Sequence, residues 1–263
     1  MIYVCIPSHN EAATVGLLLW KVRQVFVEFQ REYQFVVADD ASTDATGEVL
    51  RPYARVLPLT VIRHEQRLGY AATVEELLRS AVERSDRPKR DCAVLMHADF
   101  AHDAATLPEL VRRIEGGADL VVAEGRVSGE PSRARRFVRQ WAPLLLKGRV
   151  HVPGVSDLVS GFAAFRLATL RNAFREREPR LLATEGWTAN AELLARAARH
   201  SRRIERVESV ERHDLRTRES RIDPWETARE IWRSRSRLDV PAAKPAPAAA
   251  AREAGREVEA AAS

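Results

Sequence analysis

Short runs of apolar residues recur along the first half of the chain, and polar residues follow each one. The runs cover residues 2–6, 35–38, 59–62, 93–96 and 120–123. Apart from Thr60 they are apolar throughout, which is typical of strands covered on both faces of a sheet. Between them, apolar residues recur at helical spacing, up to about residue 31 in the first such segment and again after Gly69. From residue 2 to about residue 124, this alternation predicts an α/β fold with a mostly parallel sheet and helices on both faces.

The pattern changes in the second half of the chain. Residues 133–149 are basic and carry an apolar stripe, and residues 155–162 are predicted to form a loop with polar groups at its centre. Residues 185–200 have the spacing of an amphipathic helix, and residues 202–210 that of a strand. A second set of elements is therefore expected beyond the alternating region.

Length and C-terminal composition indicate the domain organisation. A chain of 263 residues can bury one substantial core. We expect one domain over residues 1–222 and a helix over residues 223–240. Residues 241–263 consist largely of Ala, Pro and Glu and are predicted to be disordered.

Charge and cysteine content narrow the class of protein. The 42 Lys and Arg residues exceed the 37 Asp and Glu residues, giving a net charge of +5. Clustered arginine suits phosphate groups, whether in a nucleotide diphosphate, an anionic lipid or a nucleic acid, although a GC-rich genome would also enrich arginine. The N-terminus lacks the pattern of a secretory signal, and no apolar run reaches about 18 residues. Cys5 and Cys92 lie in predicted strands and are interpreted as reduced core residues, so we expect a cytoplasmic protein.

Acidic residues follow two of the predicted strands, at the edge where ligands bind in open α/β sheets. Asp39 and Asp40 end the second run, and His97 and Asp99 follow the fourth. Residues two apart on an extended chain point to the same side, so His97 and Asp99 can reach one metal ion or phosphate. A plain polar turn, in which His97 is only hydrogen-bonded, is the alternative interpretation.

Two common nucleotide-binding motifs are absent from the sequence. No GxGxxG follows the first strand, which leaves the usual dinucleotide fold unsupported, and no GxxxxGK[ST] is present, which excludes a P-loop. Carboxylates do not bind phosphate directly, but they bind ribose hydroxyls, a base N–H, or a divalent ion that in turn binds phosphate. The strand-end carboxylates therefore indicate a nucleotide site of another kind.

Seven short segments occur in the order found in a known enzyme family, and they span about residues 2–222. They are VCIPSHNEAATV, VVADDASTDAT, MHADFAHD, AEGRV, VSDLVSGFAAFR, NAELLARAARHSRRIERV and RTRESRI. With them the chain resembles the family-two glycosyltransferases of the GT-A (Rossmann-like) fold, and among these the polyprenol-phosphate (dolichol-phosphate) mannosyl- and glucosyltransferases. The resemblance implies a catalytic domain over residues 1–222. It also implies an inverting enzyme that moves a hexose from a GDP- or UDP-linked sugar to an acceptor.

The resemblance assigns expected roles to individual residues. Pro7, Asn10 and Glu11 would line the nucleoside pocket, and Asp39 or Asp40 would contact the base or ribose. The other residues expected to bind the donor are Ala98, one of Arg135, Arg136 and Arg139 (with Arg136 as the candidate), Ser160, Gly161, and Arg221 beside Ser220 in a closing loop. The expected catalytic residues are Asp99, Arg126 and Asp157.

His97 and Asp99 fall on the DxD motif that holds Mg²⁺ or Mn²⁺ against the diphosphate in this family. Histidine binds Mn²⁺ but is a poor Mg²⁺ ligand, so we expect Mn²⁺ rather than Mg²⁺. Ala101 occupies the place of a third ligand, and Arg218 replaces the usual glycine of the closing loop. Weak binding, Mn²⁺ selectivity, and replacement of the metal by arginine charge all stay open.

The residue at the position where relatives often carry a catalytic base helps to distinguish a hydroxyl acceptor from a phosphate acceptor. Relatives that act on hydroxyls often have Glu-Asp at the start of the late helix, where this chain has Ala189 and Asn190. An amide cannot take a proton, whereas a phosphate acceptor needs no strong base, so polyprenyl phosphate is the expected acceptor. Glu185, Glu192 or Asp157 could still act as a base.

Two alternatives to this function stay open. One is the same donor chemistry with a hydroxyl acceptor on a glycan or small molecule, and the other is a non-catalytic protein that binds nucleotide sugar. No nucleic-acid partner is expected, and the oligomeric state is left open. Peripheral membrane contact would involve residues 133–146, although a core helix explains their apolar stripe equally well.

Overall fold

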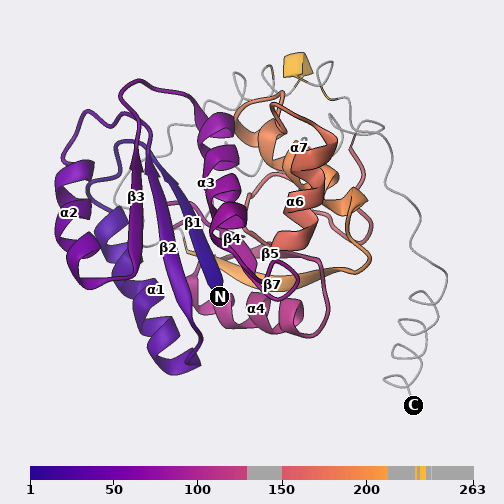
Figure 1. The fold of residues 1–263 in the computed structure, drawn as a ribbon, viewed down its shortest axis with the longest axis horizontal. Helices are drawn as coiled ribbons and strands as arrows, with labels where there is room; N and C mark the ends of the chain where they lie inside the picture. Colours follow the sequence, from indigo (N-terminus) through magenta and orange to yellow (C-terminus); the bar gives the residue numbers. More distant parts are fainter. Residues whose placement is uncertain (129–149, 213–228, 230–231, 235–237, 239–263) are drawn as a thin grey trace.

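The computed structural model describes residues 1–128, 150–212, 229, 232–234 and 238, and within them helices flank a seven-stranded sheet (Figure 1). The strands are β1 (Ile2–Ser8), β2 (Tyr33–Asp39), β3 (Leu59–Arg63), β4 (Cys92–Leu95), β5 (Leu120–Ser128), β6 (Ala163–Arg166) and β7 (Ile204–Arg212). The helices are α1 (Val15–Phe29), α2 (Thr46–Val56), α3 (Tyr70–Arg84), the 3₁₀ helix η1 (Ala104–Thr106), α4 (Leu107–Glu115), α6 (Leu167–Glu176) and α7 (Gly186–Arg199). The predicted α/β class is therefore confirmed.

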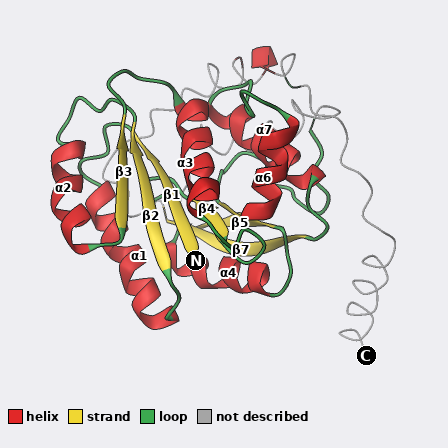
Figure 2. Cartoon of the chain, in the orientation of Figure 1, coloured by secondary structure: helices red, strands yellow, loops and turns green. Residues whose placement is uncertain are grey.

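The strands lie in the order β3-β2-β1-β4-β6-β5-β7, and β6 alone among the described strands runs antiparallel to its neighbours. The pairing of Leu95 with Ala163 brings the start of β6 to the end of β4. The loop that precedes β6 therefore arrives at the edge where β1, β2 and β4 end. Figure 2 shows the loops that leave β1, β2 and β3 at this upper edge.

Successive residues of each strand face opposite sides of the sheet, and both sides are apolar. Tyr3 and Cys5 of β1 belong to one buried cluster, whereas Val4 and Ile6 belong to another. This double burial explains why residues 2–6 form an uninterrupted apolar run. The N-terminal amino group closes the opposite edge by donating to Asp91 over 2.9 Å.

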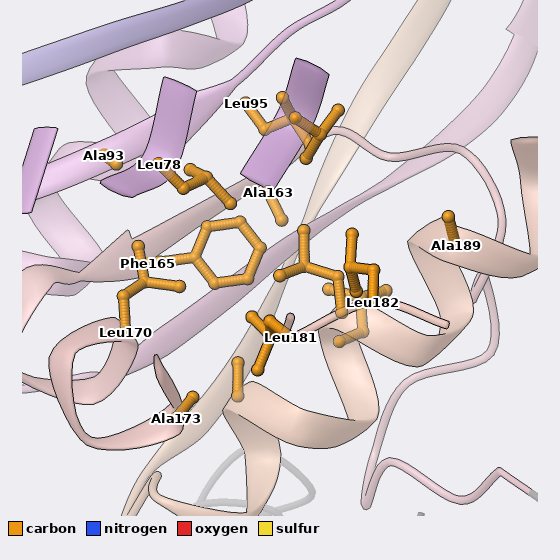
Figure 3. Close-up of a cluster of buried hydrophobic side chains, with 14 of the residues drawn as sticks. Leu78, Ala93, Leu95, Ala163, Phe165, Leu170, Ala173, Leu181, Leu182 and Ala189 are labelled. Carbon is orange, nitrogen blue, oxygen red and sulfur yellow. The ribbon is translucent and has the colours of Figure 1, made fainter. Parts of the chain in front are cut away.

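Helices α3, α6 and α7 cover one face, and α1 and α4 cover the other. Figure 3 shows the first cluster, in which Phe165 of β6 lies among Leu78 of α3, Leu170 of α6 and Leu181. Burying one such side chain contributes about 1.5–3 kcal/mol to stability. Together these contacts hold α3 and α7 against the strands that end at the site.

The C-terminal segment is described only in part. Arg229 and residues 232–234 are helical, and Leu238 is buried in the cluster on the α3, α6 and α7 face. The rest of the predicted helix over 223–240, the predicted disordered tail over 241–263 and the basic segment 133–146 lie outside the described residues. Among the helices that are described, none has the length and apolar character needed to cross a bilayer.

Candidate active site

A pocket of about 240 Å³ lies at the carboxyl edge of the sheet. The residues that line it come from the ends of β1, β2 and β4 and from the start of α3. They are Pro7, Ser8, His9, Glu11, Asp40, Arg67, Tyr70, Thr73, His97, Ala98 and Asp99. The structure therefore brings together six residues predicted from the sequence, namely Pro7, Glu11, Asp40, His97, Ala98 and Asp99.

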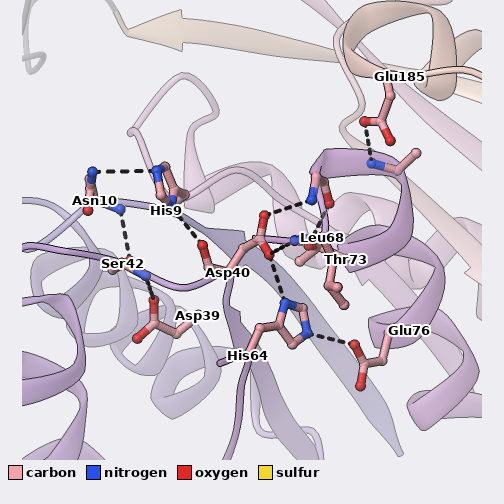
Figure 4. A network of polar contacts seen from close by, with 12 residues as sticks. His9, Asn10, Asp39, Asp40, Ser42, His64, Leu68, Thr73, Glu76 and Glu185 are labelled. Atoms are coloured by element: carbon pink, nitrogen blue, oxygen red, sulfur yellow. Dashed lines mark hydrogen bonds and ion pairs between the residues drawn. The ribbon is translucent and has the colours of Figure 1, made fainter. Parts of the chain in front are cut away.

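Asn10 joins two loops and is not among the residues that line the pocket. Its backbone has a positive φ of 56°, which asparagine tolerates better than most residues. Its N–H donates to Ser42 Oγ over 2.9 Å (Figure 4), and its Oδ1 accepts from the Thr43 N–H over 2.8 Å. Asn10 thus fixes the loop after β1 to the loop after β2, and its predicted contact with the nucleoside stays a prediction.

Asp39 and Asp40 are adjacent at the end of β2 and face opposite sides. Asp39 is fully buried, its Oδ1 accepts from the Ser42 N–H over 3.1 Å, and it is absent from the pocket lining. Asp40 lines the pocket. Of the two alternatives for contact with the nucleotide, the structure favours Asp40.

Asp40 is held by the turn that leads into α3. Its carboxylate accepts from the N–H groups of Leu68 over 2.7 Å and Gly69 over 3.0 Å, and from His64 Nδ1 over 2.8 Å (Figure 4). Burial alone would raise the pKa of Asp40, but the hydrogen bonds from His64, Leu68 and Gly69 outweigh it and lower the pKa. Asp40 is therefore ionised at neutral pH and shapes the wall of the pocket.

His64 lies between two carboxylates, because its Nε2 is 2.7 Å from Glu76 Oε2. Burial disfavours its charged form, yet the hydrogen bonds to Asp40 and Glu76 raise its pKa. Sequence reasoning missed His64, although it follows the third predicted strand by the same rule that singled out Asp39 and Asp40. Arg67, in the same turn, was also missed and is a pocket cation suited to phosphate.

His97 continues the alternation of β4 onto the face that α3 and α7 cover. Its Nε2 is 3.2 Å from the hydroxyl of Tyr70, and the two rings stack at a centroid distance of 5.4 Å. The Tyr70 hydroxyl donates to Asn190 Oδ1 over 2.7 Å, and Asn190 Nδ2 donates to the Val159 carbonyl over 2.9 Å. Burial raises the pKa of the Tyr70 hydroxyl well above its ordinary value, so it stays protonated.

Gly161 packs directly on this group. It has a φ of +74°, and a Cβ there would lie 2.6 Å from Asn190 Nδ2 and 2.8 Å from His97 Nε2. Only glycine combines this backbone conformation with so close an approach. The predicted donor-site residue Gly161 therefore lies against His97, as the pairing of β4 with β6 requires.

Asp157 organises the loop that carries Gly161. Its Oδ1 accepts from the N–H groups of Val159 over 3.1 Å and Ser160 over 3.0 Å. The hydroxyl of Ser160 is buried and has no hydrogen-bond partner in the described part of the chain. Asp157 thus shapes the loop beside His97, and the proposed catalytic role of Asp157 and the sugar contact of Ser160 stay predictions.

Glu192 in α7 and Glu185 just before this helix differ in their exposure to solvent. Glu192 is fully buried, where it binds Arg196 in an ion pair and accepts from Thr184, so it is removed from the candidate bases. Glu185, before α7, is exposed and accepts from the Ala71 N–H over 3.0 Å (Figure 4). Glu185 is therefore the more accessible of the two carboxylates.

His97 and Asp99 also decide whether a divalent cation fits. Both line the pocket, and Asp99 Oδ1 accepts from the Ala101 N–H over 3.0 Å. No cluster of three or more His, Cys, Asp or Glu suited to a metal occurs among residues 1–128 and 150–212 or the few described beyond them. A nitrogen and a carboxylate fit a cation that takes its other ligands from substrate and water.

Some predicted residues cannot be placed in the site. Arg126 lies in β5, but its side chain is outside the described part of the structure. Arg135, Arg136, Arg139, Arg218, Ser220 and Arg221 also lie outside the described residues.

Comparison with curated proteins shows similarity to sugar transferases. Over 136 residues, the chain is 26% identical to an undecaprenyl-phosphate 4-deoxy-4-formamido-L-arabinose transferase of Pseudomonas fluorescens, a match that covers 51% of this chain and 38% of that protein. Over 168 residues, it is 22% identical to a dodecaprenyl-phosphate galacturonate synthase of Rhizobium johnstonii, covering 63% of this chain and 48% of that protein. The chain thus matches less than half the length of these relatives.

Solved structures share the fold at low sequence identity. Glucosyl-3-phosphoglycerate synthase from Mycobacterium tuberculosis, in complex with Mn²⁺, UDP and glucosyl-3-phosphoglycerate, matches with a TM-score of 0.60 and 21% identity, covering 92% of this chain and 81% of that one. S. aureus TarS 1–349, in complex with UDP-GlcNAc, matches with a TM-score of 0.57 and 18% identity, covering 92% and 67%. The predicted GT-A fold is confirmed.

The predicted resemblance to polyprenol-phosphate sugar transferases is likewise supported by the names of the curated relatives. The sequence profile described as "Glycosyl transferase family 2" matches residues 3–174, from β1 to near the end of α6. By this match, which covers most of the sheet around the pocket, the chain belongs to glycosyltransferase family 2.

Proposed function

We propose that the chain transfers a hexose from a nucleoside diphosphate sugar to a polyprenyl phosphate, with inversion at the anomeric carbon. The observation that carries the donor half is the pocket where Arg67, His97 and Asp99 meet. It lies at the carboxyl edge of the sheet, where open α/β folds bind nucleotides.

UDP is the nucleotide we propose for the donor. The solved neighbours from Mycobacterium tuberculosis and S. aureus were captured with UDP or a UDP-sugar. Asp40 lines the same pocket as an ionised carboxylate, which can accept hydrogen bonds from a base N–H or a ribose hydroxyl. This choice replaces the broader expectation of GDP or UDP.

Mn²⁺ is the cation we propose for His97 and Asp99. The imidazole nitrogen of His97 favours Mn²⁺ over Mg²⁺, because Mg²⁺ prefers a shell made up of oxygen ligands. When bound, a divalent cation offsets the negative charge of the diphosphate. Arg67 is the described pocket residue that adds positive charge for the departing nucleotide.

The acceptor follows from Asn190. This amide is buried, and its oxygen and nitrogen are bound to Tyr70 and Val159, so it is neither a base nor turned toward a ligand. A phosphate oxygen of a polyprenyl phosphate is already anionic and can attack without proton transfer to the protein. The names of the two curated relatives support this acceptor.

A hydroxyl acceptor is the second candidate, and Glu185 favours it. This exposed carboxylate lies beside Gly69 at the start of α3, where a Cβ on Gly69 would be 3.2 Å from Glu185 Oε1. It is therefore close to residues that line the pocket, and it could take a proton from a hydroxyl.

The test is a transfer assay with the purified 263-residue chain. UDP-glucose, UDP-GlcNAc and GDP-mannose would each be offered with Mn²⁺, Mg²⁺ or EDTA. The acceptors would be undecaprenyl phosphate in detergent micelles and, separately, 3-phosphoglycerate. Mass spectrometry would identify the product, and the NMR coupling of its anomeric proton would give the configuration.

We expect a lipid-phosphate product from a UDP-sugar, dependent on Mn²⁺ and inverted at the anomeric carbon. Product on 3-phosphoglycerate alone, with loss of turnover in Glu185→Gln, would favour the hydroxyl acceptor. No product from any pair, with a UDP-sugar still raising the melting temperature, would indicate a non-catalytic binding protein.

A further inference from the structure

Three side chains from three elements form a hydrogen-bonded series behind the pocket. His97 follows β4, Tyr70 is the first residue of α3, and Asn190 lies in α7. The series runs from His97 Nε2 to the Tyr70 hydroxyl, from there to Asn190 Oδ1, and from Asn190 Nδ2 to the Val159 carbonyl. Asn190 is 4% exposed and its hydrogen bond to Val159 is buried, so water does not compete at that end of the series.

The donor and the acceptor of each hydrogen bond can be assigned by starting from the Val159 end of the series. The Val159 carbonyl only accepts, so the amide of Asn190 must turn its NH₂ toward Val159 and its oxygen toward Tyr70. That oxygen also only accepts, so the single hydroxyl proton of Tyr70 is donated to Asn190. The Tyr70 oxygen can then only accept from His97, which requires a proton on Nε2 of His97.

The ring orientation of His97 is fixed by packing as well. Its ring is nearly parallel to that of Tyr70, with an interplanar angle of 7°. On the Nε2 side, the backbone of Gly161 comes so near that a Cβ would lie 2.8 Å away. Nε2 is therefore directed toward Tyr70 and Gly161.

We propose that Tyr70 and Asn190 are positioning residues that hold neutral His97 as the Nε2–H tautomer, the form in which Nδ1 and not Nε2 would ligate a divalent cation. The proposal rests on the donor-site half of the proposed function. A neutral imidazole with its proton on Nε2 carries its lone pair on Nδ1, and a lone pair is what a metal requires. The opposite tautomer would present an N–H at Nδ1 and could only donate to a phosphate oxygen.

Asn190→Leu gives the sharpest test, because it keeps a side chain of similar shape and removes the acceptor for Tyr70. The freed hydroxyl of Tyr70 can then donate to Nε2 of His97, which reverses the tautomer. Adding Tyr70→Phe in the same chain removes that donor and should restore the Nε2–H form. Tyr53→Phe is the matched control, because Tyr53 packs on Gly16 of α1 and does not line the pocket.

The readout is the set of ¹⁵N chemical shifts of the histidine ring nitrogens, recorded on the metal-free 263-residue chain at about pH 8, above the ordinary histidine pKa. The chain has seven histidines, and loss of one signal set in His97→Gln assigns His97. We expect Nε2–H in the wild type and in Tyr53→Phe, Nδ1–H in Asn190→Leu, and Nε2–H again in the double variant. A wild-type ring protonated on Nδ1, or an unchanged tautomer in Asn190→Leu, would overturn the proposal.

Metal affinity provides the second measurement. The affinity for Mn²⁺ in the presence of UDP should fall about tenfold in Asn190→Leu and recover in the double variant, which a merely structural defect would not do. Absence of Mn²⁺ binding in the wild type would overturn the role of Nδ1 as a ligand. If Asn190→Leu does not fold, the wild-type spectrum decides the tautomer, and Tyr70→Phe should expose the Nε2 proton to faster solvent exchange.

These results separate the inference from the proposed function. The spectra require neither donor nor acceptor, so failure to find transfer leaves the tautomer result intact. Active transfer by a wild-type enzyme whose His97 is protonated on Nδ1 would overturn this inference and leave the proposed function standing.

Discussion

At the end of β4, the chain places two side chains of different chemistry, His97 and Asp99, in one pocket. Both side chains are proposed to hold a cation that offsets the negative charge of the donor diphosphate. An ionised carboxylate would hold a cation, and a neutral imidazole would complete its ligand set. Of the two, the carboxylate contributes the charge.

We predict that Asp99→Ala lowers the transfer rate at least about a hundredfold. Without the Asp99 carboxylate, the site would lose the cation that offsets the negative charge developing on the diphosphate. The measurement is kcat with a UDP-sugar at saturating Mn²⁺. Asp103→Ala is the control, since Asp103 caps η1 through the Ala105 N–H over 3.0 Å and does not line the pocket. A near-normal rate in Asp99→Ala would remove Asp99 from the metal site.

Gly161 allows a test of packing that is separate from catalysis. Gly161→Ala should destabilise the fold by about 2–4 kcal/mol, because backbone strain at positive φ adds to overlap with Asn190 and His97. Gly154 has nearly the same φ of +75° with nothing within 4 Å, so Gly154→Ala should cost only about 1 kcal/mol. Urea unfolding measures both. Equal losses would mean that the loop before β6 moves away from His97 at little cost.

The sequence indicated single residues at this site better than their partners. Asp40, His97 and Asp99 were predicted because polar residues after apolar strands stand out in a linear pattern. Tyr70 and Asn190 are apart from His97 by 27 and 93 positions, and their contact depends on how α3 and α7 pack on one face. No local spacing reports such a contact.

At the scale of elements, the turn between β3 and α3 forms one wall of the pocket. Asp40 accepts from Leu68 and Gly69 in this turn, and His64 links Asp40 to Glu76 of α3. The link is strongest when His64 is charged and both carboxylates are ionised. Its strength must therefore depend on pH.

The direction in which the stability of this link changes with pH follows from the pKa shifts of His64 and Asp40. The pKa of His64 is raised on folding, so its contribution is complete below about pH 6.5 and is lost as the pH rises through the raised value. The pKa of Asp40 is lowered on folding, so its contribution is present above about pH 4 and is lost as the pH falls through the lowered value. The link is complete between these limits.

We predict that His64→Gln lowers the free energy of unfolding by about 1.5–3 kcal/mol near pH 5.5 and by less near pH 9, because a charge-assisted pair is lost at the lower pH. Urea unfolding of the wild type and the variant at both pH values measures the difference. His151→Gln, at an exposed histidine, should follow the wild-type profile. A His64→Gln penalty that is the same at both pH values would show that His64 stabilises the turn without its charge.

The parallel half of the fold could be predicted from the sequence more fully than the rest. β1, β2, β4 and β5 each contain a run of four or five apolar residues that is buried on both faces of the sheet. β6 and α6 were not predicted, since β6 has only four residues, Ala163–Arg166, and runs straight into the helix. Its antiparallel insertion is a long-range pairing that periodicity cannot detect, yet it brings Gly161 to His97.

At the scale of the whole molecule, the C-terminal region has two parts. Leu238 contacts the core, whereas only the amino-acid composition of residues 241–263 can be interpreted. Leu238 is 2% exposed and lies in the cluster beside α3, α6 and α7, although it is 26 residues beyond the end of β7 at Arg212. Residues 241–263 have few large apolar side chains. The boundary of the folded unit is therefore expected just after Leu238.

Two chains test that boundary, one ending at residue 240 and the other a Leu238→Ala variant of the 263-residue chain. The shorter chain should keep the melting temperature of the 263-residue chain, because a segment of Ala, Pro and Glu cannot bury enough apolar surface to offset its ordering. Leu238→Ala should lower the stability by about 2–5 kcal/mol, the usual cost of a cavity at a buried leucine. Thermal unfolding compares the two, and Leu68→Ala, at a leucine that is 53% exposed, controls for loss of a leucine at the surface. A large drop on removing residues 241–263 would show that the tail packs on the domain, whereas an unchanged Leu238→Ala would show that the core closes without the C-terminal segment.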